Sequence, residues 1–294
     1  MKHAILGVGS IGGLIAVALS SVGEDVTPLL RPEKLASFPK QLTLEQPDRT
    51  ITAGVHAAVS QLDEVFDVLW IATKTYQLQS TFASLKITPR MIVPLLNGID
   101  HMAILRSHFD PKIVVAGAIA VEADRLSDSR FAQRNQVRLS VASAAEPVLA
   151  TVLDKLHSQL GFICQFVANE QTLLWTKLSF LAPFALVTAA SGKNKGEIFD
   201  NAEWKAALFN VIGEASAVAN ADGAQVDHEK IEVILAGTVP TMRSSMAKDL
   251  VAGRQLELDA IGGPIVRGGE KHGIPVPTTK RLMEMIREKA AKKK

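Results

Sequence analysis

The chain of 294 residues contains one cysteine, Cys164. A single thiol provides neither a disulfide framework nor a thiolate metal site within one chain, so we expect a protein of a reducing compartment. Its seven histidines are scattered without the spacing of metal ligands. The sequence therefore excludes disulfide-rich secreted folds and predicts no bound metal.

Aromatic residues and excess charge are also scarce. Phe, Trp and Tyr make up 5% of the chain and the net charge is +2, too little for the basic, aromatic-rich surface that binds single-stranded nucleic acid. We expect no nucleic-acid partner. Residues 287–294 are basic and alanine-rich, which leaves nucleic-acid contact open as an alternative. Because positive side chains are favourable at the C-terminal end of the helix dipole, we interpret residues 287–294 as a solvated helix end.

No run of uncharged apolar residues reaches the ~18 residues that a membrane span needs. The nearest candidate, residues 178–191, is interrupted by Ser, Pro and Thr. The N-terminus opens directly on a strand pattern, without the charged segment and apolar stretch of a signal peptide. These absences predict a cytoplasmic protein with no membrane partner.

What is present is an ordinary globular composition, 47% apolar and 21% charged, in a chain long enough for two domains. As far as residue 168, short apolar runs alternate with helical patterns, which predicts a doubly wound α/β domain with a parallel sheet. We expect strands at residues 2–6, 25–30, 68–72, 91–95, 113–121 and 163–167, and helices at residues 11–21, 78–85, 100–107 and 146–160. Residues 41–59 and 136–142 alternate weakly and are expected to extend the sheet near an edge.

From residue 169 onward the apolar spacing is helical. We expect a long apolar helix from about residue 170, then helices at residues 204–221, 230–235, 244–251 and 256–267. The chain is therefore predicted to form an α/β domain at 1–168 and an all-helical domain at 169–294, with the ligand site in the cleft between them.

A glycine-rich turn, Gly7-Val8-Gly9-Ser10-Ile11-Gly12, joins the first strand to the first helix. In this context the motif predicts dinucleotide binding. Gly7 makes the tight turn, Gly9 lets a pyrophosphate approach the backbone, and Gly12 permits close packing of helix on strand. The phosphates would lie on the free N–H groups at the helix start, where Ser10 and Ile11 stand. A glycine-rich turn without a ligand is the alternative.

The end of the second strand, Leu29-Leu30-Arg31, lacks the acidic residue that binds the ribose hydroxyls of NAD. Arg31 is instead suited to clamp the 2′-phosphate of NADPH. We therefore predict NADPH as the cofactor. The alternative for Arg31 is a plain surface cation.

Lys74 and Asn97 follow the next two strands of the predicted sheet. Ligands bind at the carboxyl ends of such strands, so Lys74 is expected to reach the cofactor phosphate or ribose, and Asn97 the nicotinamide ribose or the substrate. A solvated lysine at a helix start and a plain Asn-Gly turn are the alternatives.

Lys177 lies within the apolar helical pattern that begins the second half. Burial disfavours an ammonium ion, so the pKa of such a lysine is lowered and the group is a capable proton donor near neutral pH. The alternative is a lysine that extends its ammonium group to solvent. Further along, Ser244 and Ser245 precede Glu257, and hydroxyls at a helix start bind a substrate carboxylate or only cap the helix.

Together these residues resemble the ketopantoate reductase (2-dehydropantoate 2-reductase) family, nearly from end to end. The resemblance rests on the order and spacing of Gly7-x-Gly9-x-x-Gly12, Arg31, Lys74-x-x-Gln77, Asn97-Gly98, Trp175-x-Lys177-Leu178, Gly196-Glu197, Ser244-Ser245-Met246, Glu257-x-Asp259 and His272-Gly-Ile-Pro-Val-Pro. It implies an N-terminal Rossmann-type domain, a C-terminal helical domain, and reduction of a 2-oxo acid by NADPH.

The resemblance also implies residue roles. Arg31 and Lys74 would lie near the adenosine phosphate, and Asn97 would face the nicotinamide and the substrate. Lys177 would bind the keto oxygen and protonate it as hydride arrives. Ser245 would hold the substrate carboxylate, and Glu257 would line the same pocket beside substrate and cofactor and orient Lys177 or the substrate.

One departure from the family concerns the helix that carries the lysine. Family members have asparagines four and eight residues later that bind polar groups of ketopantoate, whereas this chain has Leu181 and Ala185. Positions one turn apart face the same side of a helix, so a hydroxyl of ketopantoate would meet apolar side chains. A site that hydrogen-bonds a substrate hydroxyl discriminates by ~10⁴ or more. We therefore predict a less hydroxylated, more apolar 2-oxo acid.

Two other functions fit the same residues. A noncatalytic NADP(H)-binding regulator would explain the missing asparagines, although Lys177, Ser245 and Glu257 together argue against it. A dehydrogenase that oxidises a 2-hydroxy acid would use the same residues, so the reaction direction stays open. The apolar helical half is compatible with a homodimer.

Overall fold

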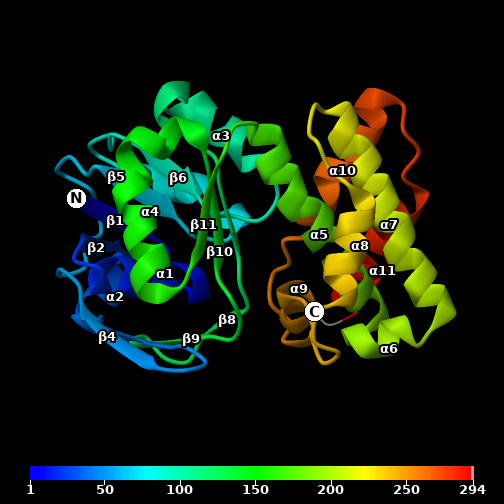
Figure 1. Ribbon diagram of the computed structural model, residues 1–294, viewed down its shortest axis with the longest axis horizontal. Helices are drawn as coiled ribbons and strands as arrows, with labels where there is room; N and C mark the ends of the chain where they lie inside the picture. Colours follow the sequence, from blue (N-terminus) through cyan, green and yellow to red (C-terminus); the bar gives the residue numbers. More distant parts are fainter. Residues whose placement is uncertain (293–294) are drawn as a thin grey trace. The chain divides into compact units, whose positions relative to one another are not determined.

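The computed structural model describes residues 1–292, and the chain in it forms two compact units (Figure 1). The first unit comprises residues 1–96 and 101–168. The second comprises the described chain from residue 169 onward, together with the short segment 97–100. This segment connects a strand and a helix of the first unit but belongs to the second by its contacts.

The first unit is built on a parallel four-stranded sheet in the order β2-β1-β5-β6. Its strands are β1 (Lys2–Leu6), β2 (Asp25–Leu29), β5 (Val68–Ile71) and β6 (Ile92–Pro94). The strands β5 and β6 are buried at every residue, as in parallel sheets covered on both faces. Helix α1 (Ser10–Ser21) connects β1 to β2, which confirms the predicted β-α-β start of the chain.

The rest of the first unit departs from one continuous parallel sheet. Strands β3 (Gln41–Glu45), β4 (Thr50–Gly54), β8 (Ala123–Arg125) and β9 (Arg130–Gln133) form a separate sheet in the order β4-β3-β9-β8. Strands β7 (Gly117–Ala120), β10 (Arg138–Ala142) and β11 (Ile163–Val167) form a third sheet, in which β7 runs antiparallel to β10. The expectation that residues 41–59 extend the first sheet holds only at the end of the stretch, where Val59 bridges Leu29 of β2, because residues 41–54 form the β3–β4 hairpin of the separate sheet. The reason is visible in β3, which buries alternate residues, as strands of a hairpin with one solvated face do.

Most helices of the first unit follow the predicted pattern. Helix α4 (Glu146–Leu160) has the predicted bounds, α3 (His101–His108) begins one residue late, and a short α2 (Pro32–Leu35) follows β2. Residues 78–85, expected to form an α-helix, contain instead the 3₁₀ segment Gln79–Ser84, which follows another 3₁₀ segment at Thr75–Gln77. The hydroxyls of Ser80, Thr81 and Ser84 each donate to the carbonyl three residues earlier, a local bond that competes with the α-helical ladder.

A buried ionisable cluster lies at the start of β1. The side chain of His3 is fully buried and accepts a 3.1 Å hydrogen bond at Nδ1 from the indole of Trp70. Burial lowers the pKa of His3 to about 4, although the Glu24 carboxylate acts in the opposite direction. Burial raises the pKa of Glu24, but the ammonium groups of Lys155, 2.7 Å away, and of the N-terminus outweigh it and hold that pKa at about 2.

This cluster predicts acid sensitivity of the first unit. The folded-state pKa of His3, about 4, lies below the ordinary 6.5, so the unfolded chain binds the extra proton first and stability falls as the pH drops from 6.5 toward 4. Between pH 7.5 and 5 this residue alone should remove about 2 kcal/mol of unfolding free energy. Guanidinium unfolding at the two pH values measures the loss, which His3→Gln should largely abolish. His56→Gln, which replaces an exposed imidazole, should keep the wild-type loss; an equal effect of both variants would contradict the assignment.

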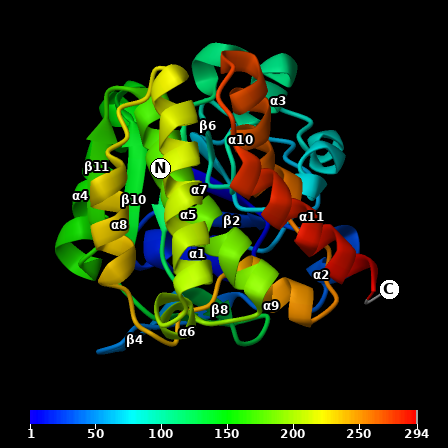
Figure 2. The same cartoon turned by 90° about the vertical axis from the view of Figure 1, so that its right-hand side faces the viewer.

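The second unit is a bundle of helices, shown in green to red in Figure 2, and no strand occurs between residues 169 and 292. Its members are α5 (Glu170–Ser191), α6 (Lys195–Phe199), α7 (Ala202–Ala221), α8 (His228–Ala236), α9 (Ser245–Val251), α10 (Leu258–His272) and α11 (Pro277–Ala291). This confirms the all-helical second half. Residues 287–292 of the basic end lie on or just after α11, and residues 293–294 lie outside the described residues.

Helix α5 is the centre of this bundle. The side chain of Asn169 caps it by accepting from the Thr172 amide, and Gly192 ends it in the left-handed conformation. By length and composition α5 is apolar enough to cross a bilayer, but 78% of its apolar window is buried within the protein, as in a core helix. It packs against α7, α9, α10 and α11.

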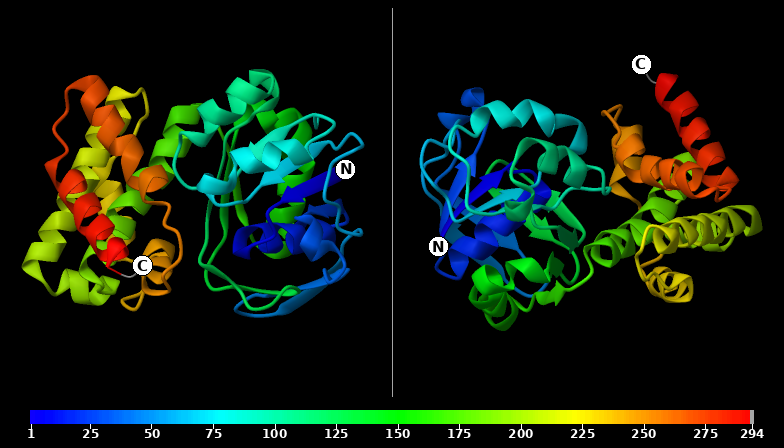
Figure 3. Two further views of the ribbon diagram at one scale, coloured as in Figure 1. Left: turned by 180° about the vertical axis from the view of Figure 1, so that it is seen from behind. Right: turned by 90° about the horizontal axis from the view of Figure 1, so that it is seen from above.

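Helix α11 forms the red end of the chain in Figure 3, and a side chain from another helix caps its start. The carboxylate of Glu214 on α7 accepts hydrogen bonds from the backbone amides of Thr278 and Thr279, both at 2.8 Å, and from the Thr279 hydroxyl. A carboxylate in this place satisfies amides that have no partner within the helix and favours the positive end of the helix dipole. Tertiary contact therefore fixes the start of α11.

Candidate functional site

The turn between β1 and α1 has the geometry that the glycine motif predicts. Gly7 adopts φ +90°, and a β-carbon there would lie 2.9 Å from the backbone nitrogen of Thr73. At Gly12 a β-carbon would lie 2.0 Å from the carbonyl oxygen of Gly7. These two positions therefore admit only glycine in this backbone.

Gly9 differs from both neighbours because nothing lies within 4 Å of the place a β-carbon would occupy. It precedes α1 as the N-cap residue, and no side chain of the described chain caps this helix. The amides at the start of α1, from Ser10 and Ile11 onward, and the open side of Gly9 therefore form an anion-binding arrangement. This arrangement fits a dinucleotide pyrophosphate.

Two cations follow the strands beside this turn. Arg31 is exposed and lies just past the carboxyl end of β2, where it precedes α2. Lys74 is half-buried and lies past the carboxyl end of β5, next to Thr73, which contacts the glycine turn. Because β2, β1 and β5 are parallel neighbours, the glycine turn, Arg31 and Lys74 lie along one edge of the sheet.

The second unit brings Lys177, Glu257 and Asn97 together. Lys177 is half-buried on α5, and burial lowers the pKa of its ammonium group to about 8, while the Glu257 carboxylate acts in the opposite direction. Glu257 is 6% exposed and occupies the N-cap position of α10. Its Oε2 accepts a 3.2 Å hydrogen bond from the Asn97 amide nitrogen. The ammonium group of Lys177, the Glu257 carboxylate and the Asn97 amide thus form one polar cluster in the helical unit.

The two serines before α9 have different environments. Ser244 is buried, its Oγ accepts from the Ala247 amide as an N-cap, and the same oxygen lies 2.6 Å from the Thr188 hydroxyl. Ser245 is the first residue of α9 and is exposed. The capping role therefore belongs to Ser244, and the Ser245 hydroxyl stays accessible.

The apolar residues one and two turns after Lys177 are also placed differently. Leu181 is half-buried and packs against the hydrophobic core of the helical unit, whereas Ala185 is fully buried within that core. Thr188, one turn further, donates to the carbonyls of Phe184 and Ala185. The helix face beyond Lys177 is therefore apolar at position 181 and closed by packing at position 185.

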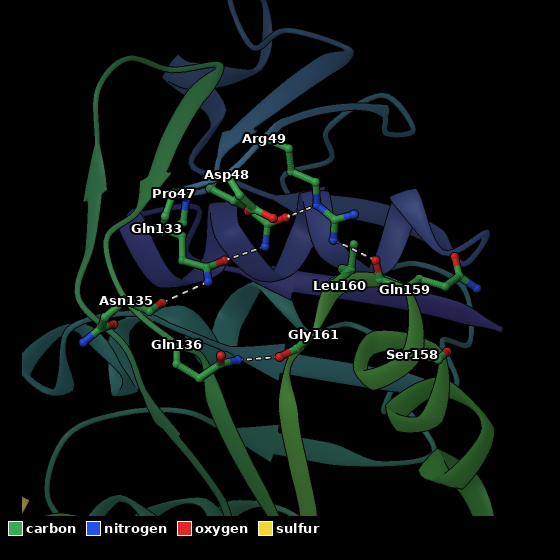
Figure 4. Close-up of a pocket in the computed structure, with 11 residues that line it drawn as sticks. Pro47, Asp48, Arg49, Gln133, Asn135, Gln136, Ser158, Gln159, Leu160 and Gly161 are labelled. Atoms are coloured by element: carbon green, nitrogen blue, oxygen red, sulfur yellow. Dashed lines mark hydrogen bonds between the residues drawn. The ribbon is translucent and has the colours of Figure 1, made fainter.

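A polar pocket of about 490 Å³ in the first unit contains none of the predicted site residues (Figure 4). It lies at the turn between β3 and β4, the end of β9 and the turn after α4. Its side chains bind one another: Gln46 donates to Gln133 at 2.9 Å, and Arg49 donates to Gln46 and to the Gln159 carbonyl, both at 2.7 Å. These bonds engage the amide and guanidinium groups of the pocket, and in the described part of the chain no lysine or histidine lines it that could act as the general acid of the predicted reaction.

Asn97 belongs to the helical unit, a placement that the sequence does not predict. It follows β6 of the α/β half, yet its segment, residues 97–100, is part of the helical unit. Hydrophobic periodicity gives no signal for this placement of residues 97–100, because the contacts that decide it come from α10.

Within residues 1–292, no group of three or more His, Cys, Asp or Glu side chains is arranged to hold a metal ion.

Comparison with known proteins supports the resemblance. Two family models match, ketopantoate reductase PanE/ApbA over residues 3–146 and the ketopantoate reductase PanE/ApbA C terminal over residues 169–290. A 2-dehydropantoate 2-reductase of Caulobacter vibrioides is 27% identical over 293 residues, which cover 96% of this chain and 97% of that protein.

Solved structures show the same fold. A PanE/ApbA family ketopantoate reductase from Ralstonia eutropha JMP134 superposes with a TM-score of 0.86 at 24% identity, covering 100% of this chain and 99% of the other. The ternary structure of D-mandelate dehydrogenase with NADH and anilino(oxo)acetate gives a TM-score of 0.88 at 21% identity, with coverages of 100% and 99%. The family models account for nearly the whole chain, so this protein belongs to the ketopantoate reductase PanE/ApbA family of oxidoreductases.

Proposed function

We propose that this protein is an NADPH-dependent reductase of an apolar 2-oxo acid. The observation that carries the proposal is the cluster of Lys177, Glu257 and Asn97: an ammonium group with a pKa of about 8, coupled to a buried carboxylate that an amide donor holds. A group with this pKa is protonated at neutral pH and gives up its proton readily, as a general acid needs to do.

In the proposed reaction, NADPH supplies the hydride that adds to the keto carbon. The Lys177 ammonium donates a hydrogen bond to the keto oxygen, stabilises the negative charge that develops there, and transfers its proton to that oxygen. The neutral amine then recovers a proton from water. Glu257 orients the ammonium group, Asn97 lies beside the reacting carbonyl, and the accessible Ser245 hydroxyl binds the substrate carboxylate.

The cofactor part of the proposal rests on the glycine turn and the two cations along the same sheet edge. In the proposed complex the free amides of α1 and the open side of Gly9 bind the pyrophosphate, and Arg31 and Lys74, along the same sheet edge, bind the adenosine phosphate. At the end of β2, Leu29 and Leu30 offer no carboxylate for ribose hydroxyls. Arg31 therefore favours the 2′-phosphate of NADPH.

Cofactor choice can be tested with Arg31→Ala. We expect the KM for NADPH to rise roughly 10- to 100-fold, equivalent to the loss of one or two charge-assisted hydrogen bonds of about 1.5 to 3 kcal/mol, while the KM for NADH changes little. Initial rates with both cofactors measure the effect. Arg49→Ala, which removes a cation of the pocket in Figure 4, is the control and should alter neither value. A similar loss with both cofactors in Arg31→Ala would refute the 2′-phosphate contact.

The substrate part of the proposal rests on the residues after Lys177. Leu181 presents an apolar, half-buried side chain, and Ala185 is closed within the core, so neither position supplies a partner for a substrate hydroxyl. A hydroxyl placed there would lose the hydrogen bonds it makes with water. D-Mandelate dehydrogenase, which shares this fold, shows that the architecture is not restricted to ketopantoate.

A panel of 2-oxo acids tests the function directly. Oxidation of NADPH should be more efficient with branched or aromatic 2-oxo acids without hydroxyl groups than with ketopantoate. Leu181→Asn should shift the ratio of kcat/KM values toward ketopantoate, by about tenfold, as expected for one regained hydrogen bond. Efficient, selective turnover of ketopantoate by the natural protein would refute the apolar substrate. Cofactor binding without turnover of any 2-oxo acid would favour the noncatalytic regulator.

A further inference from the structure

The segment Asn97–Asp100 is attached to helix α10 at three points. At its first residue, the Asn97 amide donates to Glu257, which precedes α10. At its second, Gly98 has φ +79° and lies so close to α10 that a β-carbon would stand 2.1 Å from the carbonyl oxygen of Ala260. At its last, the carboxylate of Asp100 accepts from the guanidinium of Arg267. We call this segment the strap.

The middle attachment depends on a proline within α10. Pro264 has no N–H, so the carbonyl of Ala260, four residues earlier, lacks its helical donor. Gly98 packs against this same oxygen, a place where a side chain of any size would collide with it. The carbonyl oxygen of Ala260 is therefore open toward the strap. Because Gly98 has no side chain, the strap backbone can pack directly against this oxygen.

The last attachment is made by Arg267, which reaches back along α10. Its Nη1 donates to Asp259 on α10 itself, at 2.9 Å, and its Nη2 donates to Asp100 on the strap. The guanidinium lies across Gly263, where a β-carbon would be 2.6 Å from Nη2. Because Gly263 has no side chain, the Arg267 guanidinium can lie across it and bind both Asp100 on the strap and Asp259 in the first turn of α10.

We propose that Arg267 is a positioning residue, which through Asp100 fixes the strap and so holds the Asn97 amide against Glu257 in the cluster with Lys177. This inference rests on the proposed reductase function. Arg267 acts at a distance, because its guanidinium binds Asp100 and Asp259 rather than Lys177 or Glu257. The segment is four residues long, so fixing both of its ends removes most of the conformational freedom of Asn97.

The position of Asn97 on the strap should affect the rate of the reaction. A catalytic group displaced by about 1 Å loses up to a hundredfold in rate, so a strap free at one end should weaken turnover without destabilising the fold. A partly exposed ion pair contributes little to stability by itself, because solvent screens it. Catalysis and stability should therefore respond differently to its removal.

Asp259 provides a matched control, since it binds the same guanidinium but lies on α10 and not on the strap. Arg267→Gln and Asp100→Asn should each lower kcat/KM for the best 2-oxo acid about tenfold, mainly in kcat, with the midpoint of thermal unfolding unchanged. Arg267→Lys should recover part of the loss.

In the control Asp259→Asn, kcat/KM should stay within about twofold of wild type. The double variant Asp100→Asn/Arg267→Gln should have a kcat/KM no lower than that of either single variant. An equal loss in Asp259→Asn, or additive losses in the double variant, would overturn the proposal.

Hydrogen–deuterium exchange tests the strap without any substrate. The peptide that covers residues 97–101 should exchange at least tenfold faster in Arg267→Gln and Asp100→Asn than in wild type and Asp259→Asn. Unchanged exchange would overturn the strap, and faster exchange with unchanged kinetics would overturn the positioning role. If the natural protein turns over no 2-oxo acid, the proposed function and the positioning role both fail, and exchange still decides whether Arg267 fixes the strap.

Discussion

Lys177→Ala is expected to lower kcat/KM for the 2-oxo acid about a thousandfold while NADPH binding stays at the wild-type level. General acid catalysis by one positioned group contributes about 10²- to 10⁴-fold, and this side chain also stabilises the developing charge on the keto oxygen. The cofactor should be unaffected because its proposed phosphate contacts lie in the first unit. Steady-state kinetics and NADPH fluorescence titration measure the two quantities separately.

The pH dependence gives the same assignment an independent test. Lys177 acts in its protonated form and has a pKa of about 8, so kcat/KM should be flat below that pH and fall tenfold per unit above it. The Glu257 carboxylate raises this pKa, so Glu257→Gln should move the alkaline limb to lower pH. Lys177→Arg keeps the positive charge but cannot release a proton, so it should retain part of the activity and lose the limb near pH 8.

A neighbouring residue controls for damage to α5. Thr176 precedes Lys177 and is exposed, so Thr176→Ala should leave kinetics and thermal stability unchanged. Lys177→Ala should keep the wild-type fold by circular dichroism, because the unfavourable burial of the ammonium and its attraction to the Glu257 carboxylate act in opposite directions. Wild-type kcat/KM in Lys177→Ala, or an alkaline limb that Glu257→Gln does not move, would rule out Lys177 as the acid.

The parts of the fold that the sequence predicted well are those where local signals and packing agree. Helix α4 has both predicted bounds because its apolar periodicity ends at Gly161, which takes the left-handed conformation of a C-cap. Strand β11 likewise has both predicted bounds. The glycine turn has the predicted geometry because Gly7 takes a positive φ and Gly12 packs directly on the carbonyl of Gly7, as the motif requires.

The parts that could not be predicted depend on contacts between distant residues. The strap at residues 97–100 follows a strand of the first unit, and only its bonds to Glu257, Ala260 and Arg267 assign it to the second. The start of α11 depends on Glu214, 64 residues away from Thr278. The hydroxyl of Ser244 is paired with that of Thr188, 56 residues away across the bundle. No local pattern encodes such pairs.

The glycine turn allows a sharper separation of folding from binding than Lys177 does. Gly12→Ala would place a β-carbon 2.0 Å from the carbonyl oxygen of Gly7, and because both partners are backbone, α1 has to move away from β1. We expect a loss of roughly 2 to 3 kcal/mol in the stability of the first unit, the usual cost of overpacking. Thermal and guanidinium unfolding measure it, and NADPH binding should be lost with the turn geometry.

Gly9→Ala should weaken NADPH binding without lowering the stability of the first unit. Its φ of −83° suits alanine and nothing lies within 4 Å of the new β-carbon, so the free protein should unfold at the wild-type temperature. If the pyrophosphate approaches the backbone here, the methyl group stands in its path, and NADPH affinity should fall about 10- to 100-fold, equivalent to 1 to 3 kcal/mol of steric conflict. Calorimetric titration of NADPH into both variants decides the matter. Wild-type affinity in Gly9→Ala would mean that the cofactor does not pass this residue, and the anion-binding role of α1 would then have to be abandoned, however well the glycine spacing fits it.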